Sequence, residues 1–308
     1  MDWNLSFQFT IITLSGDKSQ IINYNNPLFH CFSQEIYFSE NFQYHVSEHW
    51  HEDLETLYVK EGVFRCCING TGITLNQGEG IFINSKRIHS NGTVKNKHCL
   101  LYCSIVHPSY LCASRYIEDK YVSPIIGAGS FDYLLLRKGE WTEEILNILI
   151  SLFEKPESLV LELEIIEASY HILSLLYKNI KPSTSTVPNT SLYEDTFKSM
   201  VTYIGEHFQE KLSLDDIAAA GNIGKTLCAK IFKKYASKTP GDYLIHYRIT
   251  QSMEWLSDRN RKITDIAFSA GFNSTSHYTE TFRKIVGCTP NQFRNITEKY
   301  RPAQKKRY

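Results

Sequence analysis

Long hydrophobic runs are missing from this 308-residue sequence, and no apolar stretch reaches the roughly 18 residues that a membrane-spanning helix needs. The first residues, MDWNLSFQF, also lack the basic start and the small-residue cleavage site of a secretory signal peptide. We therefore expect a cytoplasmic protein that has no membrane partner.

Paired cysteines are missing as well. The eight cysteines include no CxxC pair, and their number is ordinary for a chain of this length. We expect reduced cytosolic thiols that mostly serve as small core residues.

A net charge of one sign is also absent, but the balance of zero hides an asymmetry between two parts of the chain. Residues 1–192 carry 14 Lys and Arg against 21 Asp and Glu, whereas residues 193–308 carry 19 against 12. An acidic part followed by a basic part indicates that the second part meets a polyanion.

The hydrophobic pattern changes along the chain. Short apolar runs between Gly and Asn turns over residues 20–107 predict an antiparallel sandwich or barrel. Apolar residues at helical spacing over 140–180 predict helices, and the Pro, Ser and Thr of KPSTSTVPNTS that follow are typical of a linker. We expect four regions, at residues 1–139, 140–180, 181–192 and 193–308.

The last region contains an internal repeat. The triplet DIA occurs at residues 216 and 265, and each copy continues as a short helix, a glycine turn and a second helix. Ser213 and Asp216 form a capping box in the first copy, while Thr264 and Asn273 are the expected caps in the second. This arrangement predicts two helix-turn-helix units whose second helices enter the major groove of DNA.

LSLDDIAAAG, IFKKYASKTPGDYL and KITDIAFSAGFNSTSHYTETFRK together resemble the signature of AraC/XylS-type transcription regulators over about 100 residues. The resemblance implies two helix-turn-helix units joined by a helix over residues 241–257, and a homodimer that activates RNA polymerase after binding a small molecule. Some positions depart from the family pattern, namely Gly224, Cys228, Ser237 and Ser252. These departures suggest a looser first unit.

The resemblance also implies which side chains face double-stranded DNA. In the first unit they are Lys225, Thr226, Ala229, Lys230, Lys233 and Lys234, and in the second unit Ser274, Thr275, Ser276, Thr279, Glu280 and Arg283. Lys230 could contact guanine or a phosphate, and we favour the phosphate. For Glu280, two roles are equally open: accepting a hydrogen bond from cytosine, or remaining a solvated charge that pairs with Lys284.

The heptapeptide HWHEDLE at residues 49–55 raises a question about the first region. His49, His51 and Glu55 are separated by even steps, so on a strand they share one face. Histidine nitrogen with carboxylate oxygen suits zinc, manganese or iron. The local spacing leaves a metal site, a catalytic dyad and the wall of a binding pocket all open.

HWHEDLETLYVKEG resembles the first cupin motif, and GEGIFINSKRIH is similar to the second, although Asn84 and Lys86 stand where proline and glycine are usual. The resemblance to the cupin sensors of AraC-type regulators implies an organic effector rather than a metal. A sugar would suit polar groups for its hydroxyls and rings for its apolar face. The candidate effector-binding residues are His49, His51, Glu55, Tyr58, Phe82 and His89.

We therefore expect an α+β multidomain chain: a cupin-like β-barrel with a helical dimerisation segment, followed by an all-α double helix-turn-helix domain. The expected function is transcription regulation without enzymatic activity, metal or cofactor. One alternative is a metal cupin oxygenase or isomerase fused to a DNA-binding domain. Another is an effector-independent DNA-binding protein whose cupin only dimerises.

Overall fold

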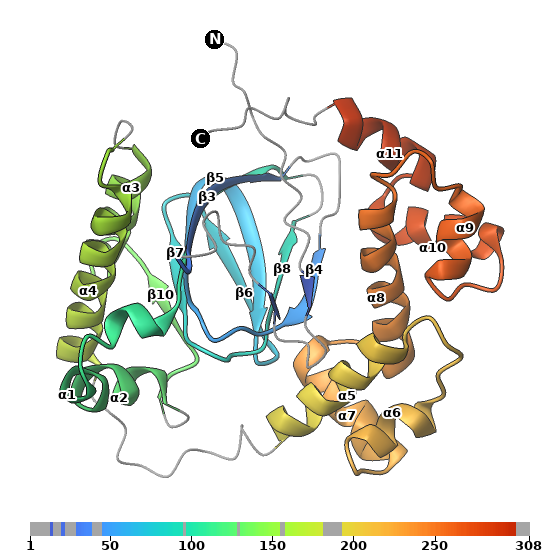
Figure 1. Cartoon of the computed structure of the whole chain (residues 1–308), viewed down its shortest axis with the longest axis horizontal. Coiled ribbons are helices and arrows are strands. Elements are labelled where there is room, and N and C mark those ends of the chain that lie inside the picture. Colours follow the sequence, from blue (N-terminus) through green and yellow to red (C-terminus); the bar gives the residue numbers. More distant parts are fainter. Residues whose placement is uncertain are drawn as a thin grey trace.

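The computed structural model describes residues 13–14, 20–21, 29–38, 45–94, 97–127, 130–154, 158–180 and 193–299. A central β-structure lies between two helical layers (Figure 1). We call residues 29–180 the N-terminal domain and residues 193–299 the C-terminal domain. The linker expected at residues 181–192 lies outside the described residues.

The β-structure is built around one long strand, β5. This strand crosses between two layers, because its first half pairs with β7 and β9 and its second half pairs with β6 and β8. The register shifts between Val59 and Glu61, next to Gly62, whose φ of +82° favours glycine. The strands are β3 (Cys31–Phe38), β4 (His45–His49), β5 (Leu54–Ile68), β6 (Thr71–Asn76), β7 (Gly80–Ile83), β8 (His89–Thr93), β9 (Cys99–Val106) and β10 (Tyr133–Leu136), besides the two-residue pair β1 (Thr13–Leu14) and β2 (Gln20–Ile21).

Alternation along β5 separates two apolar cores. Leu57, Val59 and Phe64 face the interior between the layers, where Ile81 and Leu101 join them. In the first half of β5, Leu54 and Tyr58 face outward and pack with a helical layer. Helices rather than solvent therefore cover the outer face of this part of the sheet.

That helical layer consists of two helices on one side of the β-structure (Figure 1), α3 (Glu143–Glu154) and α4 (Leu161–Asn179). Ile145, Leu146 and Leu149 of α3 are each at most 1 % exposed, and Ile145 and Leu146 pack in one core with Phe82 and Leu136 of the sheet. Short turns precede them: a 3₁₀ helix Pro108–Leu111, α1 (Arg115–Ile117), a π turn Glu118–Val122 and α2 (Ser123–Ile126).

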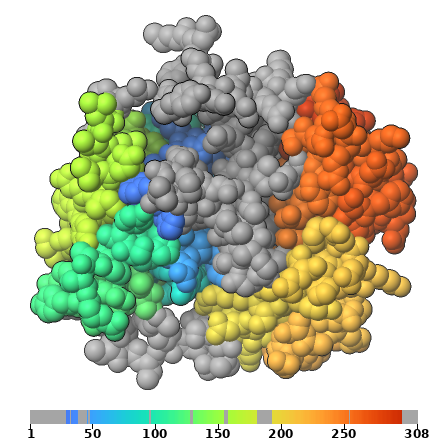
Figure 2. Space-filling view, viewed as in Figure 1, coloured from blue at the N-terminus to red at the C-terminus, as the bar shows by residue number. Residues whose placement is uncertain are grey.

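The C-terminal domain is helical throughout its described residues. Its helices are α5 (Glu194–His207), α6 (Leu214–Ala220), α7 (Lys225–Ala236), α8 (Pro240–Trp255), α9 (Ile263–Ser269), α10 (Thr275–Val286) and α11 (Pro290–Lys299). We call α6 and α7 the first unit and α9 and α10 the second unit; α8 connects them. In Figure 2 these helices cover the opposite side of the molecule from α3 and α4.

Several expected helix starts can be compared with the structure. The Ser213 capping box is present, with Asp216 donating its amide to Ser213 at 3.2 Å. In the second unit the predicted caps are wrong: α9 begins after Lys262 without a side-chain cap, and α10 is capped by Ser274 instead of Asn273. Among the helices that the structure describes, none is long and apolar enough to cross a bilayer.

Candidate functional site

Four buried side chains meet inside the N-terminal domain, and we call them the histidine cluster: His49, His51, Glu55 and His89. They are 1–4 % exposed. His49 ends β4 and pairs directly with His89 at the start of β8, so two strand ends bring the histidines together. Their imidazole rings lie 4.1 Å (His49–His89) and 4.9 Å (His51–His89) apart between centroids.

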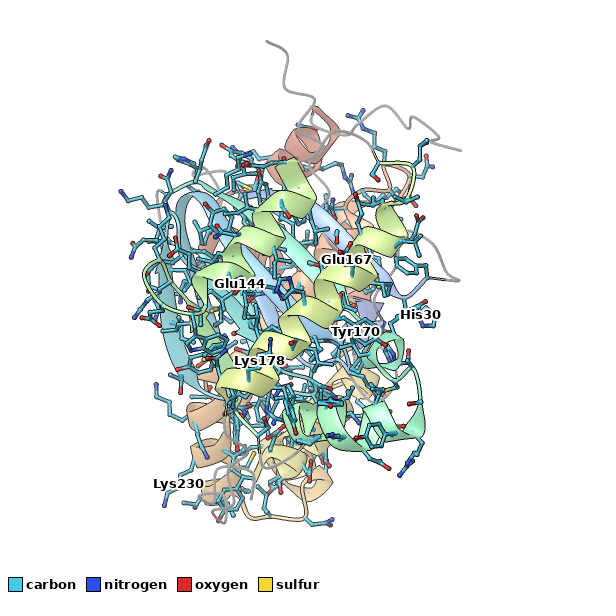
Figure 3. The ribbon with its side chains drawn as sticks, turned by 90° about the vertical axis from the view of Figure 1, so that its left-hand side faces the viewer. His30, Glu144, Glu167, Tyr170, Lys178 and Lys230 are labelled. Carbon is cyan, nitrogen blue, oxygen red and sulfur yellow. The ribbon has the colours of Figure 1, made fainter. Side chains whose placement is uncertain are left out.

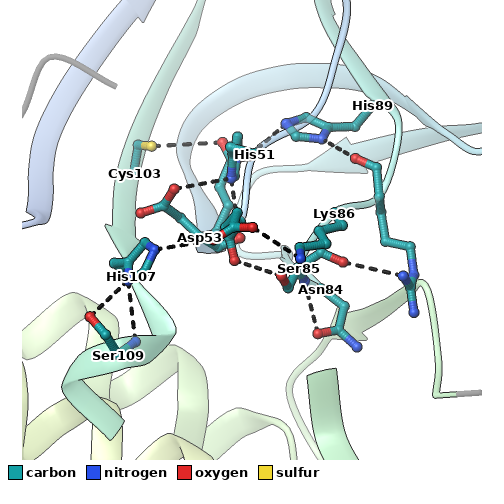
Figure 4. A network of polar contacts seen from close by, with 12 residues as sticks. His51, Asp53, Asn84, Ser85, Lys86, His89, Cys103, His107 and Ser109 are labelled. Carbon is teal, nitrogen blue, oxygen red and sulfur yellow. Dashed lines mark hydrogen bonds and ion pairs between the residues drawn. The ribbon is translucent and has the colours of Figure 1, made fainter. Parts of the chain in front are cut away.

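Backbone carbonyl groups fix two of these rings. Nδ1 of His51 lies 3.1 Å from the carbonyl oxygen of Asp53, and Nδ1 of His89 lies 2.8 Å from that of Arg87 (Figure 4). A carbonyl oxygen only accepts, so Nδ1 must carry the hydrogen in both rings. In a neutral imidazole, Nε2 is then a lone-pair acceptor.

Both Nε2 atoms point toward the same carboxylate oxygen. Oε2 of Glu55 lies 3.0 Å from Nε2 of His89 and 3.6 Å from Nε2 of His51. Cys103 donates its thiol to the other oxygen of Glu55 at 3.8 Å. None of the three facing atoms has a hydrogen-bond partner among the described residues. Three acceptors that converge in a buried space repel one another unless a proton or a cation lies between them.

The two histidines also lower the pKa of the Glu55 carboxyl. Burial by itself would raise the pKa of the Glu55 carboxyl, but the imidazoles of His51 and His89 outweigh burial and hold the pKa well below its ordinary value.

The cluster fits a divalent cation. Nitrogen atoms of His49, His51 and His89 can be chosen that all lie within 4.8 Å of one another, and Glu55 adds an oxygen next to two of them. Three histidines and a carboxylate suit zinc, manganese or iron. The carbonyl partners at Nδ1 are the outer contacts that orient metal-binding histidines.

Tyr58 and Phe82, the predicted aromatic wall, lie elsewhere. Both belong to the core that faces α3 and α4, with Tyr58 against Tyr102 at 5.8 Å and Phe82 against Phe131 at 5.9 Å. The structure therefore separates them from the histidine cluster by the thickness of the sheet. Tyr58 is an odd step from Glu55, so alternation along β5 points the two side chains to opposite faces.

The two departures in the second motif have structural roles. Asn84 donates its amide hydrogens to the carbonyl oxygens of Ile125 and Phe131. Lys86 adopts a positive φ of 62° and donates its backbone amide to the carbonyl oxygen of His51. Both contacts hold the turn before His89 in place.

In the C-terminal domain, the predicted DNA-facing side chains lie on the open faces of α7 and α10. Every predicted residue of α7 is exposed, and on α10 only Thr275 and Thr279 are half-buried. The side chains expected to face inward are buried, among them Cys228, Phe232 and Phe282. Lys225 pairs with Asp215 of α6 at 2.8 Å.

One exposed side chain on this face was not predicted from the sequence. His277 lies in the first turn of α10, with its ring 5.4 Å from that of Phe272. Its position, three residues after Ser274 and three before Glu280, was the available signal, because residues three apart share a helix face.

Comparison with known proteins divides the chain in the same way. The family model of the cupin domain matches residues 42–105, and that of a helix-turn-helix domain matches residues 217–296. Together they cover the strands that carry the histidine cluster and both helix-turn-helix units.

The relatives are transcriptional regulators. YdeC of Bacillus subtilis, an uncharacterised helix-turn-helix regulator, is 26% identical over 272 residues, which are 86% of this chain and 91% of that protein. The melibiose operon regulatory protein of Escherichia coli K12 is 32% identical over 102 residues, about a third of each chain. The solved structure of ToxT from Vibrio cholerae is 14% identical and covers 86% of this chain and 97% of that one, with a TM-score of 0.45.

Proposed function

We propose that a small effector controls this chain, which is an AraC-family helix-turn-helix transcription regulator with an N-terminal cupin domain and not an enzyme. The effector occupies the histidine cluster and alters the way the first and second units bind double-stranded DNA. The observation that carries the proposal is the convergence of three buried acceptor atoms, which creates a demand for a positively charged or hydrogen-donating occupant.

On the DNA side, α7 and α10 enter successive major-groove segments. The exposed lysines of α7, with Arg283 and Lys284 of α10, supply phosphate contacts that make affinity fall steeply with salt. In the cytoplasm the protein activates transcription through contact with RNA polymerase.

The chain acts as a homodimer through the helical segment 140–180. Supporting this, the start of α4 exposes large apolar side chains: Leu159 is 103 %, Leu161 42 % and Leu163 68 % exposed. Figure 3 shows the outward side of α3 and α4 with Glu144, Glu167, Tyr170 and Lys178, and no other described helix or strand covers it. A second copy placed there would cover these leucines.

Two effector classes compete for the histidine cluster. A sugar would use the imidazoles and Glu55 for its hydroxyl groups, but Tyr58 and Phe82 lie on the other face of the sheet and offer it no stacking surface. A divalent metal ion is the second candidate, favoured by the two lone-pair Nε2 atoms that face Glu55. The metal would be held by His49, His51, His89 and Glu55 and would act as the sensed or structural ion.

The test measures occupancy and DNA binding together. Full-length protein is assayed for bound metal, and its melting temperature is recorded with Zn²⁺, Mn²⁺, Fe²⁺ and a panel of sugars. A ligand that binds the folded protein but not the unfolded chain raises the melting temperature by mass action. His51→Ala and His89→Ala should abolish the shift while leaving basal DNA binding nearly intact; His30→Ala, at an exposed position just before β3, is the control.

The outcome also separates the two classes. Stoichiometric metal, or a shift with metal alone, identifies an ion. A shift with one sugar identifies an organic effector. If neither metal nor sugar shifts the wild-type protein, the cluster is not an effector site.

A further inference from the structure

The strands that carry the histidine cluster also contact the first unit with their alternate residues. His51 and His89 face the cluster, whereas their neighbours Trp50 and Ile88 point the other way. Trp50 is 8 % and Ile88 1 % exposed, and both belong to the apolar core of the C-terminal domain. That core also contains Phe197, Met200, Val201, Ile231, Phe232, Tyr235 and Tyr243.

Polar contacts surround these two apolar side chains. Lys238, just after α7, donates to the carboxylate of Glu48 at 3.1 Å, and Glu48 is only 3 % exposed. The hydroxyl of Tyr243 donates to the carbonyl oxygen of Glu48 at 3.3 Å. Lys198 of α5 donates to the carbonyl oxygen of Lys86 at 3.0 Å. These four side chains join β4 and the turn before β8 to α5, α7 and α8.

A turn of the N-terminal domain also touches the end of α7. A Cβ added at Gly70, between β5 and β6, would lie 1.9 Å from the carbonyl oxygen of Lys234. This backbone-to-backbone approach leaves no room for a side chain. The contact is local, because beside Glu48 a cavity of about 320 Å³ separates the domains, lined by Arg65 and Asn91 on one side and Lys238 and His246 on the other.

The core of the second unit takes no side chain from the N-terminal domain among the described residues. Its core consists of Ile249, Leu256, Ile266, Ala267, Phe272, Tyr278, Phe282 and other side chains of residues 249–293, all from the C-terminal domain.

We propose that Glu48, Trp50, Ile88 and Gly70, which we call the shared wall, are positioning residues for DNA binding by the first unit. They complete its core and fix where α7 stands, although they touch no DNA. A further consequence rests on the proposed function: each occupant of the histidine cluster acts first on the first unit, since one peptide step separates His49 from Glu48, His51 from Trp50, and His89 from Ile88.

The test uses full-length protein without effector, so that it is independent of whether the cluster binds anything. A DNA site is obtained by binding-site selection, and hydroxyl-radical footprinting then reports the half-site of each unit separately. Trp50→Ala should weaken protection of the first half-site by about tenfold or more, because a large buried ring is removed. Protection of the second half-site should remain, and Trp50→Phe should restore most of the first.

Two glycines provide a matched pair. Gly70 and Gly78 both have φ near +87°, at 86° and 88°, so alanine causes similar backbone strain at each. No atom lies within 4 Å of a Cβ added at Gly78, whereas at Gly70 it collides with α7. Gly70→Ala should therefore weaken protection of the first half-site selectively, whereas Gly78→Ala should not weaken it.

The proposal is overturned if a folded Trp50→Ala or Gly70→Ala protein protects both half-sites as the wild type does, or loses both equally. If Trp50→Ala does not fold, the glycine pair decides. If no effector binds but the footprints change as expected, the shared wall supports the first unit structurally and does not transmit effector binding.

Discussion

The two helix-turn-helix units share one repeat but differ in how they are stabilised. The difference lies in the second helix of each unit: Ser274 caps α10 by accepting the amide hydrogen of His277, and Gly287 supplies the left-handed residue that ends α10. α7 lacks both devices. Gly224 offers no side-chain cap to α7, and the left-handed position after α7 is held by Ser237.

The first unit compensates with tertiary contacts. Its core takes in Trp50 and Ile88, and Lys238 pairs with the buried Glu48. Burial raises the pKa of Glu48, and Lys238 opposes that increase. The position of α7 therefore depends more on contacts with the N-terminal domain than the position of α10 does.

The largest expected effects come from removing one ring in each core. Phe232 and Phe282 are both 0% exposed, so Phe232→Ala and Phe282→Ala should each cost about 3–5 kcal/mol. Hydrogen exchange should show that the loss of protection spreads to different elements in the two variants. Phe232→Ala should loosen α7 together with β4 and β8, while Phe282→Ala should loosen α9 and α10 alone. If both variants lose protection in the N-terminal domain to the same extent, the two units do not differ in their dependence on that domain.

The charged side chains that are predicted to face DNA should also distinguish the two units. Glu280→Gln should strengthen non-specific binding and reduce discrimination at one base pair by about 1–3 kcal/mol, if Glu280 accepts a hydrogen bond from cytosine. Lys230→Ala should weaken binding to all sequences and lower the salt slope by about one, as expected for a phosphate contact. Binding-site selection at several salt concentrations measures both. An unchanged motif with Glu280→Gln leaves that residue a solvated charge.

The left-handed residues after α7 and α10 allow a reciprocal exchange. Ser237→Gly should stabilise the first unit by up to about 1–2 kcal/mol, because a side chain at φ +54° is strained. Gly287→Ala should destabilise the second unit by a similar amount, since φ there is +92° and no neighbour adds a clash. Chemical denaturation of the full chain gives the values. The same sign for both changes would argue against this account of the helix ends.

The caps should give the smallest differences. Ser274→Ala removes the cap of α10 and should cost about 0.5–2 kcal/mol. Gly224→Ser adds a cap to α7 and should stabilise it by only a few tenths of a kcal/mol. Both are measured without DNA, because Ser274 is also a predicted DNA contact. A gain at Gly224 larger than the loss at Ser274 would reverse the expected order.

The sequence by itself determined the features that depend on short-range periodicity. The repeat at residues 216 and 265, the inward face of Cys228, Phe232, Tyr278 and Phe282, and the shared face of His49, His51 and Glu55 all follow from helical or strand spacing. The family model matches bear out the order of a cupin domain followed by helix-turn-helix units. The predicted cap at Asn273 is wrong because its polar neighbour Ser274 takes that position. The predicted cap at Thr264 is wrong because α9 begins earlier, after Lys262, so Thr264 lies inside the helix.

Only the tertiary structure decided which strand ends lie side by side. The meeting of His89 with His49, and of Trp50 and Ile88 with the core around Phe232, depends on pairings between β4, β5 and β8 and on the docking of α7 and α8. Alternation assigns a side chain to one of two faces, but it does not say what covers that face. Tyr58 and Phe82 face α3 and α4, and Trp50 faces another domain, because those choices are made by long-range packing.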